Sequence, residues 1–366
     1  MPSLPVALVC PASFKGHLLP RQAARAMAEG AALAGWAADE RPVADGGEGT
    51  LDALARELHT VSVSGPYGDA VDAAWGVAPD GSAVVEMARA SGILLAPRER
   101  RDLRVASTFG TGQLLKAAMA SGARWLIVGL GGSATNDGGM GAMRALGARF
   151  LDATGSELTR PDALVRLDRV DLSRWERWPG EVIAAVDVDN PLTGSAGATR
   201  MFGPQKGGTA ETLELMEASL VRYGEVLERT FGWKVSQSPG AGAAGGIGAA
   251  LLAFLGARFK PGVDVVLEAT GFDAAVQAAD VLLTGEGRLD AQSLHGKSVA
   301  GVLRRAQGRP VVALCGRVDL APVQWKAFGF ADAVALSPEA PPADMATAVS
   351  LLREGARRAL LRRGPT

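Results

Sequence analysis

The chain has 366 residues, a formal net charge of -1 and 48% hydrophobic residues. These values suit a globular protein of two domains, and they argue against a basic surface for nucleic acid or for membrane lipids. Cys10 and Cys315 are the only cysteines, which argues against a disulfide framework and favours a reducing compartment. The first residues carry a short apolar run and no charged n-region, so they predict a strand rather than a signal peptide. We therefore expect a cytoplasmic protein.

Strands and helices are expected to alternate at the start of the chain. Residues 4–10 form an apolar run that is typical of a buried strand, and residues 40–44 suggest a second strand. Helical patterns cover residues 20–34 and 48–58. This order predicts a parallel sheet that is covered by helices.

The middle of the chain has a different pattern. Residues 69–88 alternate apolar and polar side chains around Asp80 and Gly81, which predicts a β-hairpin. Residues 146–159 suggest a second hairpin. Residues 235–257 carry no charge and are long enough to span a bilayer, but glycines and polar residues fill the first half of this run. We interpret it as a glycine-rich loop that opens a buried helix, and we expect no transmembrane segment.

The strand–helix alternation returns near residue 280. Three apolar runs predict strands, and they are separated and followed by helical patterns. The expected strands are 281–285, 310–316 and 331–336, and the expected helices are 297–307, 322–328 and a final one from Pro342.

These patterns together predict an α/β protein of two domains. Residues 1–60 and 281–366 are expected to form an outer Rossmann- or flavodoxin-like domain with a parallel sheet. Residues 61–280 are expected to form a second α/β domain, which contains antiparallel strands and is inserted into the first.

Loops that are rich in glycine and polar residues follow five apolar runs that predict strands, which are residues 4–10, 40–44, 125–130, 182–186 and 281–285. Ligands of open α/β sheets collect beyond the carboxyl ends of the strands, where such loops lie. Lysine is rare, with seven among 38 basic residues, yet Lys15, Lys206 and Lys297 each stand beside a glycine. A compact ammonium next to bare backbone suits contact with phosphate, although solvated loop lysines would give the same pattern. The five loops are SFKG (13–16), DGGEGT (45–50), GGSATNDGG (131–139), DVDNPLTG (187–194) and GEGRLD (285–290).

Two pairs of acids stand out in these loops. Asp45 and Glu48 surround two glycines just before an expected helix, where backbone N–H groups attract anions; a simple helix cap is the alternative. Asp187 and Asp189 share one face of an extended segment, with side chains about 7 Å apart. Such a pair suits Mg²⁺ with a substrate phosphate, and a solvated turn capped by Asn190 is the alternative.

Two stretches approach known nucleotide signatures. Gly129, Gly131 and Ala134 match G-x-G-x-x-[GA], and Asp152 stands where an acid for the ribose belongs. A dinucleotide-dependent oxidoreductase acting on a small hydroxy acid therefore stays open, although residues 136–139 intervene before the next helix.

Residues 289–298 match the P-loop pattern except for Ala291, which stands in place of the first glycine. The preceding strand is expected to end near Thr284, which leaves a long excursion before the helix. We interpret the match as coincidental in geometry and keep a phosphate role for Lys297.

Eight motifs in this order closely resemble the type I glycerate kinase family, and they cover nearly the whole chain. They are SFKG (13–16), ADGGEGT (44–50), STFGTG (107–112), GLGGSATNDGG (129–139), DVDNPLTG (187–194), FGPQKG (202–207), PGAGAAGG (239–246) and GEGRLDAQSLHGK (285–297).

The resemblance implies a kinase that uses ATP and Mg²⁺ to phosphorylate glycerate, usually on the 2-hydroxyl, with the site in the cleft between two α/β domains. The expected partners are these two small molecules, with neither nucleic acid nor membrane, and homo-oligomerisation stays open.

On the resemblance and on the chemistry of the loops we expect the following roles. Lys15 and Lys297 hold the phosphates of ATP, Asp187 or Asp189 holds Mg²⁺, and Asp45 or Asp189 accepts the hydroxyl proton. Arg288 suits the carboxylate of the substrate. The further expected binding residues are Ser13, Gly46, Gly47, Glu48, Ser107, Thr108, Gly131, Gly132, Ser133, Asn136, Asp137, Asn190, Gly285, Glu286, Asp290 and His295.

The chain departs from the family pattern at two positions. Ala12 stands where the family usually has an aspartate, and Ala291 stands where it usually has a glycine. The first change removes a carboxylate next to the expected site, so a non-catalytic sensor of sugar acids is a further alternative.

Overall fold

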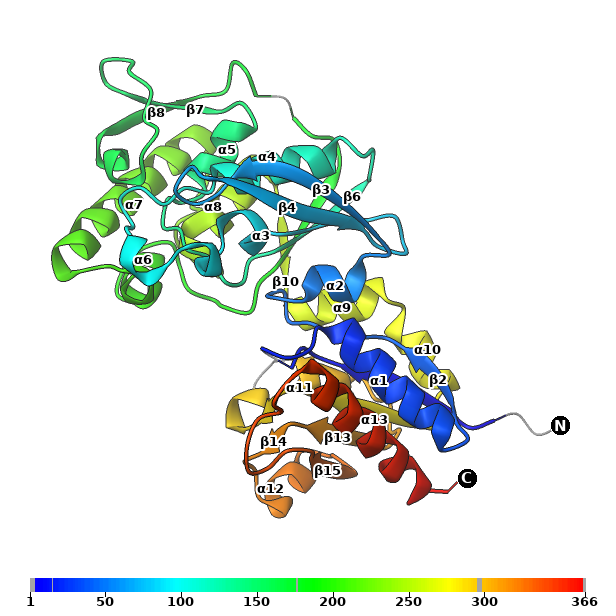
Figure 1. The fold of residues 1–366 in the computed structure, drawn as a ribbon. Coiled ribbons are helices and arrows are strands. Elements are labelled where there is room, and N and C mark those ends of the chain that lie inside the picture. The colour runs from blue at the N-terminus through cyan, green and yellow to red at the C-terminus, as the bar shows by residue number, and fades with distance from the viewer. Residues whose placement is uncertain (1–3, 15, 176, 295–297, 365–366) are drawn as a thin grey trace. The chain divides into compact units, whose positions relative to one another are not determined.

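The computed structural model of the chain describes residues 4–14, 16–175, 177–294 and 298–364 (Figure 1). It divides into two compact units. Unit 1 contains the residues up to 45, residues 52–54 and the residues from 263 onward, and unit 2 contains residues 46–51 and 55–262. The sequence placed the domain boundaries at 60/61 and 280/281. No described helix is both long and apolar enough to cross a membrane.

Unit 1 is built on a five-stranded sheet in which every neighbouring pair is parallel, with the order β15-β13-β11-β1-β2. The strands in its middle are continuous apolar runs, and every residue of β11 and β13 is buried, as expected for a sheet covered on both faces. The α/β fold predicted from the sequence is confirmed. The strands are β1 (Val6–Pro11), β2 (Ala37–Glu40), β11 (Val281–Gly285), β13 (Val311–Cys315) and β15 (Asp332–Ala335).

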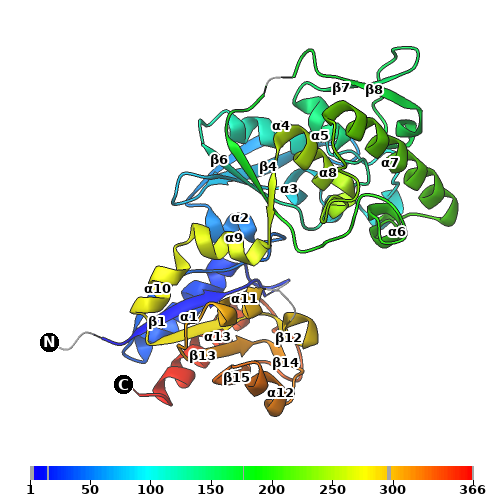
Figure 2. The same cartoon turned by 180° about the vertical axis from the view of Figure 1, so that it is seen from behind.

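Helices cover both faces of this sheet. The apolar stripes of α1 and α13 form one core with residues of β1, β11 and β13. Helices α10 and α11 contact β1 and β11, and they are seen best from behind (Figure 2). The helices of unit 1 are α1 (Pro20–Leu33), α10 (Phe272–Ala278), α11 (Ser298–Arg304), α12 (Pro322–Ala327) and α13 (Met345–Leu361), and α9 (Gly262–Ala269) begins at the boundary.

Unit 2 contains a six-stranded sheet of mixed direction, with the order β10-β9-β6-β5-β4-β3. β3, β4 and β5 are antiparallel, and the others are parallel. The hairpin predicted around Asp80 and Gly81 is confirmed, because β4 and β5 pair across that turn. The strands are β3 (Glu57–Ser64), β4 (Ala70–Val77), β5 (Ala83–Glu86), β6 (Trp125–Gly129), β9 (Glu181–Ala185) and β10 (Arg258–Lys260).

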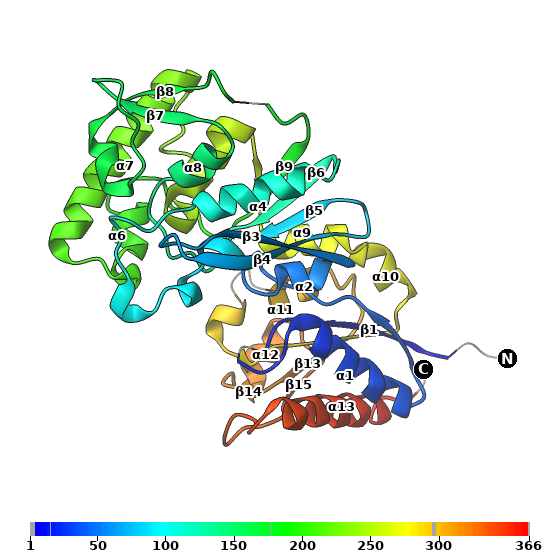
Figure 3. The ribbon, with the colours of Figure 1, turned by 45° about the horizontal axis from the view of Figure 1, so that its top comes forward.

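The helices of unit 2 include α4 (Phe109–Met119), which packs on β3, β4 and β5 (Figure 3). Helix α8 (Ala243–Leu255) occupies the uncharged run that the sequence assigned to a loop and a buried helix. Its opening residues 244–246 have positive φ, so the regular helix starts only after the glycines. The remaining helices are α2 (Thr50–Leu54, which straddles the units), α3 (Ala88–Ser91), α5 (Met140–Ala145), α6 (Ala198–Phe202) and α7 (Ala210–Phe231).

Three local predictions differ from the structure. The strand expected at 40–44 was wrong: β2 covers Ala37–Glu40 and ends where the expected strand begins, and beyond it only single hydrogen bonds from Arg41 N to Val9 O and from Val43 N to Pro11 O keep the chain beside β1. The helix expected at 48–58 is only five residues long, because the alternating, β-branched stretch from Glu57 forms β3. The turn expected in 146–159 is present, with Leu158 N donating to Phe150 O. Its first strand, β7 (Arg149–Asp152), nevertheless pairs with the distant β8 (Leu167–Asp171).

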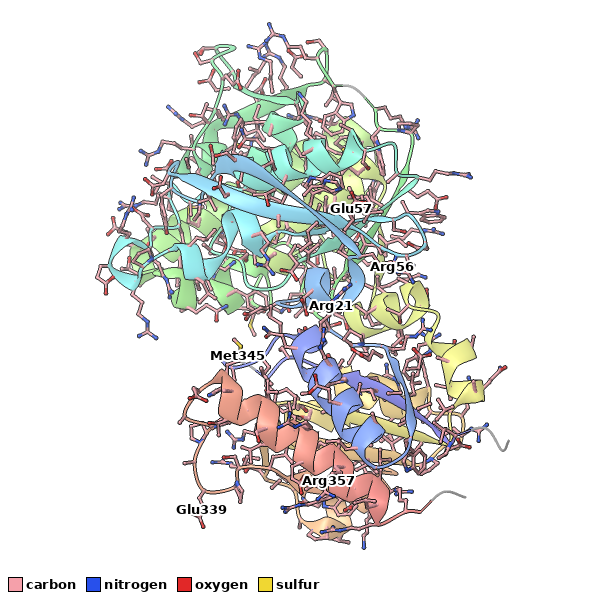
Figure 4. All side chains as sticks on the ribbon, turned by 45° about the vertical axis from the view of Figure 1, so that its right-hand side comes forward. Arg21, Arg56, Glu57, Glu339, Met345 and Arg357 are labelled. Atoms are coloured by element: carbon pink, nitrogen blue, oxygen red, sulfur yellow. The ribbon has the colours of Figure 1, made fainter. Side chains whose placement is uncertain are left out.

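Helices α1 and α13 lie side by side and pack closely through small residues (Figure 4). A Cβ placed on Gly30 would overlap the carbonyl oxygen of Arg353 and would lie 2.9 Å from the Cβ of Ala356. At the start of α13, Met345 Sδ lies 3.8 Å from Nε2 of Gln22 on α1. Gly30 therefore sets how closely these two helices approach.

We expect Gly30→Ala to destabilise the protein by about 1–3 kcal/mol, because the added methyl meets backbone that cannot rotate away. This figure is the net change, since the steric cost outweighs the roughly 1 kcal/mol by which alanine favours a helix over glycine. Urea unfolding measures the change. Ala32→Ser on the exposed side of the same helix is the control, and equal stabilities of the two variants would contradict the packing argument.

Candidate active site

The carboxyl ends of three parallel strands bring motif loops together in unit 2. Glu86, Gly129 and Ala185 end β5, β6 and β9, and they are register partners across the sheet. The GLGGSATND and DVDN segments leave from the last two of these positions. Part of the ADGGEGT loop joins them, since Gly131 N donates to Gly46 O. Three of the loops expected from the sequence therefore meet at one sheet edge.

The glycines of these loops permit an approach that side chains would block. A Cβ on Gly131 would lie 2.5 Å from Cα of Gly47, and one on Gly129 would lie 2.6 Å from O of Gly46. Gly46 itself has φ of +85°, and its Cβ would meet Ala185 at 2.9 Å. The glycine pattern of the two motifs thus has a packing cause. It also leaves bare backbone at the edge of the sheet.

Glu86 is a member of this edge that the sequence analysis missed. Its side chain is buried, Oε1 accepts a hydrogen bond from Leu51 N at 2.7 Å, and Oε2 accepts one from Arg89 Nε at 2.9 Å. The carboxylate thereby holds the first turn of α2, just after the ADGGEGT glycines. The available signal was a single acid at the end of an apolar strand.

The Asp137 carboxylate is fully buried and accepts four hydrogen bonds. Its donors are Thr108 N and Thr108 Oγ1, both at 2.8 Å, Gly139 N at 3.0 Å and Gly141 N at 3.2 Å. Burial raises the pKa of this carboxyl, and the hydrogen bonds from Thr108, Gly139 and Gly141 oppose that rise. Ser107 lies beside this network, and its Oγ accepts a hydrogen bond from Phe109 N. The carboxylate thus ties the start of α4 to the GGSATND loop.

The GGSATND loop is fixed on both sides of Ser133. Ile93 N donates to Gly132 O at 2.8 Å, and Ala134 N donates to Ser91 O at 2.9 Å. Asn136 is buried and donates from Nδ2 to Thr199 Oγ1 at 2.9 Å.

Lys206 holds this loop from its buried side through two hydrogen bonds, although it was absent from the expected site residues. Its side chain is 2% exposed, and Nζ donates to Ser133 Oγ at 2.8 Å and to Thr135 O at 2.7 Å. Burial lowers the pKa of this ammonium to about 7, and the negative charge of Asp137 partly offsets the effect. The lysine beside a glycine in FGPQKG was the signal in the sequence.

The DVDN segment places its two aspartates differently. Asp187 Oδ1 accepts a hydrogen bond from Gly262 N at 2.8 Å. In the described part of the chain, the exposed Asp189 carboxylate has no hydrogen-bond or ion-pair partner. Asn190 Nδ2 donates to Ala196 O at 2.7 Å and so shapes the turn. Glu48 is exposed in the neighbouring ADGGEGT loop.

The described residues contain no cluster of three or more histidines, cysteines or acids that could hold a metal ion. The described residues of the DVDN segment therefore do not form a metal site made of protein ligands alone. Mg²⁺ bound with a nucleotide needs only one or two carboxylates, since water and phosphate oxygens complete its shell. Asp187 and Asp189 fit that donor set.

Unit 1 gathers the remaining expected residues at the carboxyl ends of its own strands. Ser13 follows β1 and Glu286 follows β11, and these strands are parallel partners, with Ala12 N donating to Gly285 O at 2.8 Å. Asp45 ends the segment that runs beside β1 after β2, where Val43 N donates to Pro11 O at 2.9 Å. Lys15, His295 and Lys297 lie outside the described residues.

Arg288 and Asp290 follow in the same part of unit 1 and have partners of their own. The Arg288 guanidinium donates to Asp319, and two arginines, Arg317 foremost, lower the pKa of that carboxyl to about 2. Asp290 Oδ1 accepts hydrogen bonds from Gln292 N and Ser293 N. A substrate carboxylate would have to compete with Asp319 for Arg288.

Comparison with known proteins identifies the family. Residues 7–361 match the model of the glycerate kinase family. This chain belongs to the glycerate kinase family. Glycerate kinase from Halalkalibacterium halodurans is 44% identical over 321 residues, which cover 84% of each chain. Glycerate 2-kinase from Escherichia coli K12 is 45% identical over 286 residues, or 75% of each chain.

A solved structure agrees with this assignment. A crystal structure from Salmonella typhimurium LT2, which carries the provisional name glycerate kinase 2, matches with a TM-score of 0.89 and 35% identity. The match covers 99% of this chain and 98% of that one.

The two nucleotide signatures do not have their usual geometry in this family member. In unit 2, residues 130–139 separate β6 from α5, whereas a Rossmann helix starts within the fingerprint. In unit 1, β11 ends at Gly285 and α11 begins at Ser298, so the P-loop match does not lie on a direct strand-to-helix turn. Neither match supports the binding mode for which its signature is known.

We expect Asp137→Asn to destabilise the protein by about 3 kcal/mol, because the new NH₂ group faces donors in a buried site. Urea unfolding measures the loss. Asp72→Asn, on an exposed position of β4, is the matched control and should change stability by less than about 0.5 kcal/mol. Equal effects of the two changes would show that the Asp137 network contributes little.

Lys206 should make stability depend on pH. Between about pH 7 and the ordinary lysine pKa of 10.5, the unfolded chain holds a proton that the folded chain has released. The free energy of unfolding should therefore rise with pH in that window, by about 1 kcal/mol for each pH unit. Urea unfolding at pH 7.0 and 8.5 tests this.

Lys206→Met should remove that rise, and Lys234→Met, at an exposed lysine, should retain it. The comparison between variants isolates the contribution of Lys206. It is needed because burial raises the pKa of Cys10 and Cys315, and these thiols therefore lower stability as the pH rises further. The same slope in wild type and Lys206→Met would contradict the lowered pKa.

Proposed function

We propose that this protein transfers the terminal phosphoryl group of ATP to the 2-hydroxyl of glycerate and gives 2-phosphoglycerate and ADP. The family match over residues 7–361 supports the kinase activity and its substrate. The name of the Escherichia coli relative, glycerate 2-kinase, supports the choice of hydroxyl. The observation that carries the proposal is the meeting of the ADGGEGT, GLGGSATND and DVDN loops at one sheet edge.

Phosphoryl transfer asks the protein mainly to position reactants and to neutralise charge. Bare backbone N–H groups of the glycine loops suit phosphate oxygens, and so would the ammonium groups of Lys15 and Lys297. Arg288 remains our candidate for binding the substrate carboxylate, and its guanidinium would release Asp319 in order to do so. Asp137 and Glu86, which are buried and hydrogen bonded, would shape the loops rather than touch a ligand.

The acidic residues divide into two roles under this proposal. Asp187 already accepts a hydrogen bond from Gly262, so Asp189 is the better metal ligand of the DVDN pair. Mg²⁺, when bound, would neutralise charge on the phosphates. Asp45 then serves as the base that accepts the proton of the attacking hydroxyl.

The proposed partners are glycerate and ATP, and we propose a cytoplasmic protein. The free and buried thiols of Cys10 and Cys315 support a reducing compartment.

ADP release in the presence of glycerate and ATP tests the function, and NMR of the product distinguishes the 2-phosphate from the 3-phosphate. Glycerate-dependent ADP release with a 2-phosphoglycerate product is expected. A purified, folded protein that consumes no ATP with glycerate would refute the proposal, and a 3-phosphate product would refute the choice of hydroxyl.

Substitution of the two carboxylates should separate their roles. We expect Asp45→Asn to lower kcat by about 10²- to 10⁴-fold at any Mg²⁺ concentration, because a general base contributes on that scale. Asp189→Asn should lower kcat/KM and should recover part of it as Mg²⁺ is raised. Asp72→Asn is the control and should leave the kinetics unchanged. Recovery of Asp45→Asn by Mg²⁺, without recovery of Asp189→Asn, would reverse the two assignments.

A further inference from the structure

Lys206 is a buried lysine without a direct counterion. In the described chain, no carboxylate lies within ion-pair distance of Nζ, and Asp137 acts on it only from further away. The ammonium instead donates to a hydroxyl, Ser133 Oγ, and to a carbonyl, Thr135 O. Burial of a cation is costly unless its surroundings compensate for lost water. Stability alone gives no reason for a lysine at this position.

The Ser133 hydroxyl accepts one hydrogen bond, and its own O–H donates to no described residue. Oγ accepts the hydrogen bond from Lys206, and no described residue accepts the hydroxyl proton. Ser133 is 7% exposed, and the adjacent Gly132 is exposed with φ of +73°. Ser133 therefore lies just under the surface of the loop. Its proton is left for a group that arrives from outside the loop.

The backbone around Ser133 has little freedom of its own. The carbonyl before it and the N–H after it are both hydrogen bonded, to Ile93 N and Ser91 O. The rotation of the side chain and of the O–H group is what remains to be fixed. A cationic donor fixes it and strengthens the O–H as a donor, because hydrogen bonds in series polarise one another in a low dielectric.

On the basis of the proposed function, we infer that Lys206 is a positioning residue, which orients and polarises the Ser133 hydroxyl to donate to an oxyanion of a substrate. The oxyanion is a phosphate oxygen of ATP or the carboxylate of glycerate, since both are negatively charged acceptors. Lys206 itself stays beneath the loop and acts through Ser133. The charge of the ammonium then supports an anion that it does not touch.

A double-mutant cycle tests this coupling. Lys206→Met and Ser133→Ala should each lower kcat/KM by about 10-fold or more, as expected for the loss of a charge-assisted hydrogen bond. The double variant should be no worse than Ser133→Ala alone, because Lys206 has no route to the substrate without the hydroxyl. A rise in KM for ATP alone identifies the phosphate as the oxyanion, and a rise in KM for glycerate alone identifies the carboxylate.

Two controls separate positioning from general damage. Ser133→Thr keeps a hydroxyl and should keep most of the activity together with the sensitivity to Lys206→Met. Lys234→Met removes an exposed lysine of the same unit and should leave both KM values unchanged. If Lys206→Met does not fold, the comparison of Ser133→Ala with Ser133→Thr decides. If Ser133→Ala loses substrate affinity and Ser133→Thr keeps it, the inference is supported. If the two variants have the same substrate affinity, the inference is overturned.

Losses that simply add in the double variant would also overturn the inference, as would unchanged kcat/KM in a folded Lys206→Met protein. These outcomes concern the inference alone. A wild-type protein that releases no ADP with glycerate would instead refute the proposed function, and the two failures are therefore distinguishable.

Discussion

The architecture of the unit 2 edge depends on the close approach of two glycine loops. Gly131 and Gly47 meet with so little room that a methyl group on Gly131 would lie 2.5 Å from Cα of Gly47. Only backbone fits there. That contact brings the ADGGEGT loop to the end of β6, next to the segment that follows β9. If it were opened by a side chain, the loops would separate and their N–H groups would no longer share one surface.

Buried charges then hold these loops in a fixed shape. Glu86 fixes the start of α2, Asp137 joins the GGSATND loop to α4, and Lys206 supports the same loop from below. Asp137 and Lys206 are satisfied by backbone groups and hydroxyls, and Glu86 by a backbone N–H and the guanidinium of Arg89. The free energy of burying each group is therefore coupled to one loop conformation. Such a site is organised before a substrate arrives. This is the condition under which fixed dipoles assist phosphoryl transfer without reorganising.

The sequence predicted the parts of the structure that depend on local pattern. Continuous apolar runs such as Val281–Gly285 became central strands, and Asp80–Gly81 became the predicted turn, because burial and turn chemistry act over a few residues. Glu86 and Lys206 could not be placed, since their partners lie 35 and 73 positions away in the chain. Asp137 was noticed as a binding residue, but its four donors come from backbone and hydroxyl groups that no spacing rule reveals.

The choice of lysine at position 206 agrees with the geometry beneath the loop. This chain prefers arginine, with only seven lysines among 38 basic residues. Arginine would bring a planar fork of five donors and a charge that it cannot release, and both are costly in a closed space with two acceptors. An ammonium is compact, and burial has already lowered its pKa to about 7. Binding of an anion near Ser133 would raise this pKa and favour the charged form, because an opposite charge nearby stabilises the ammonium.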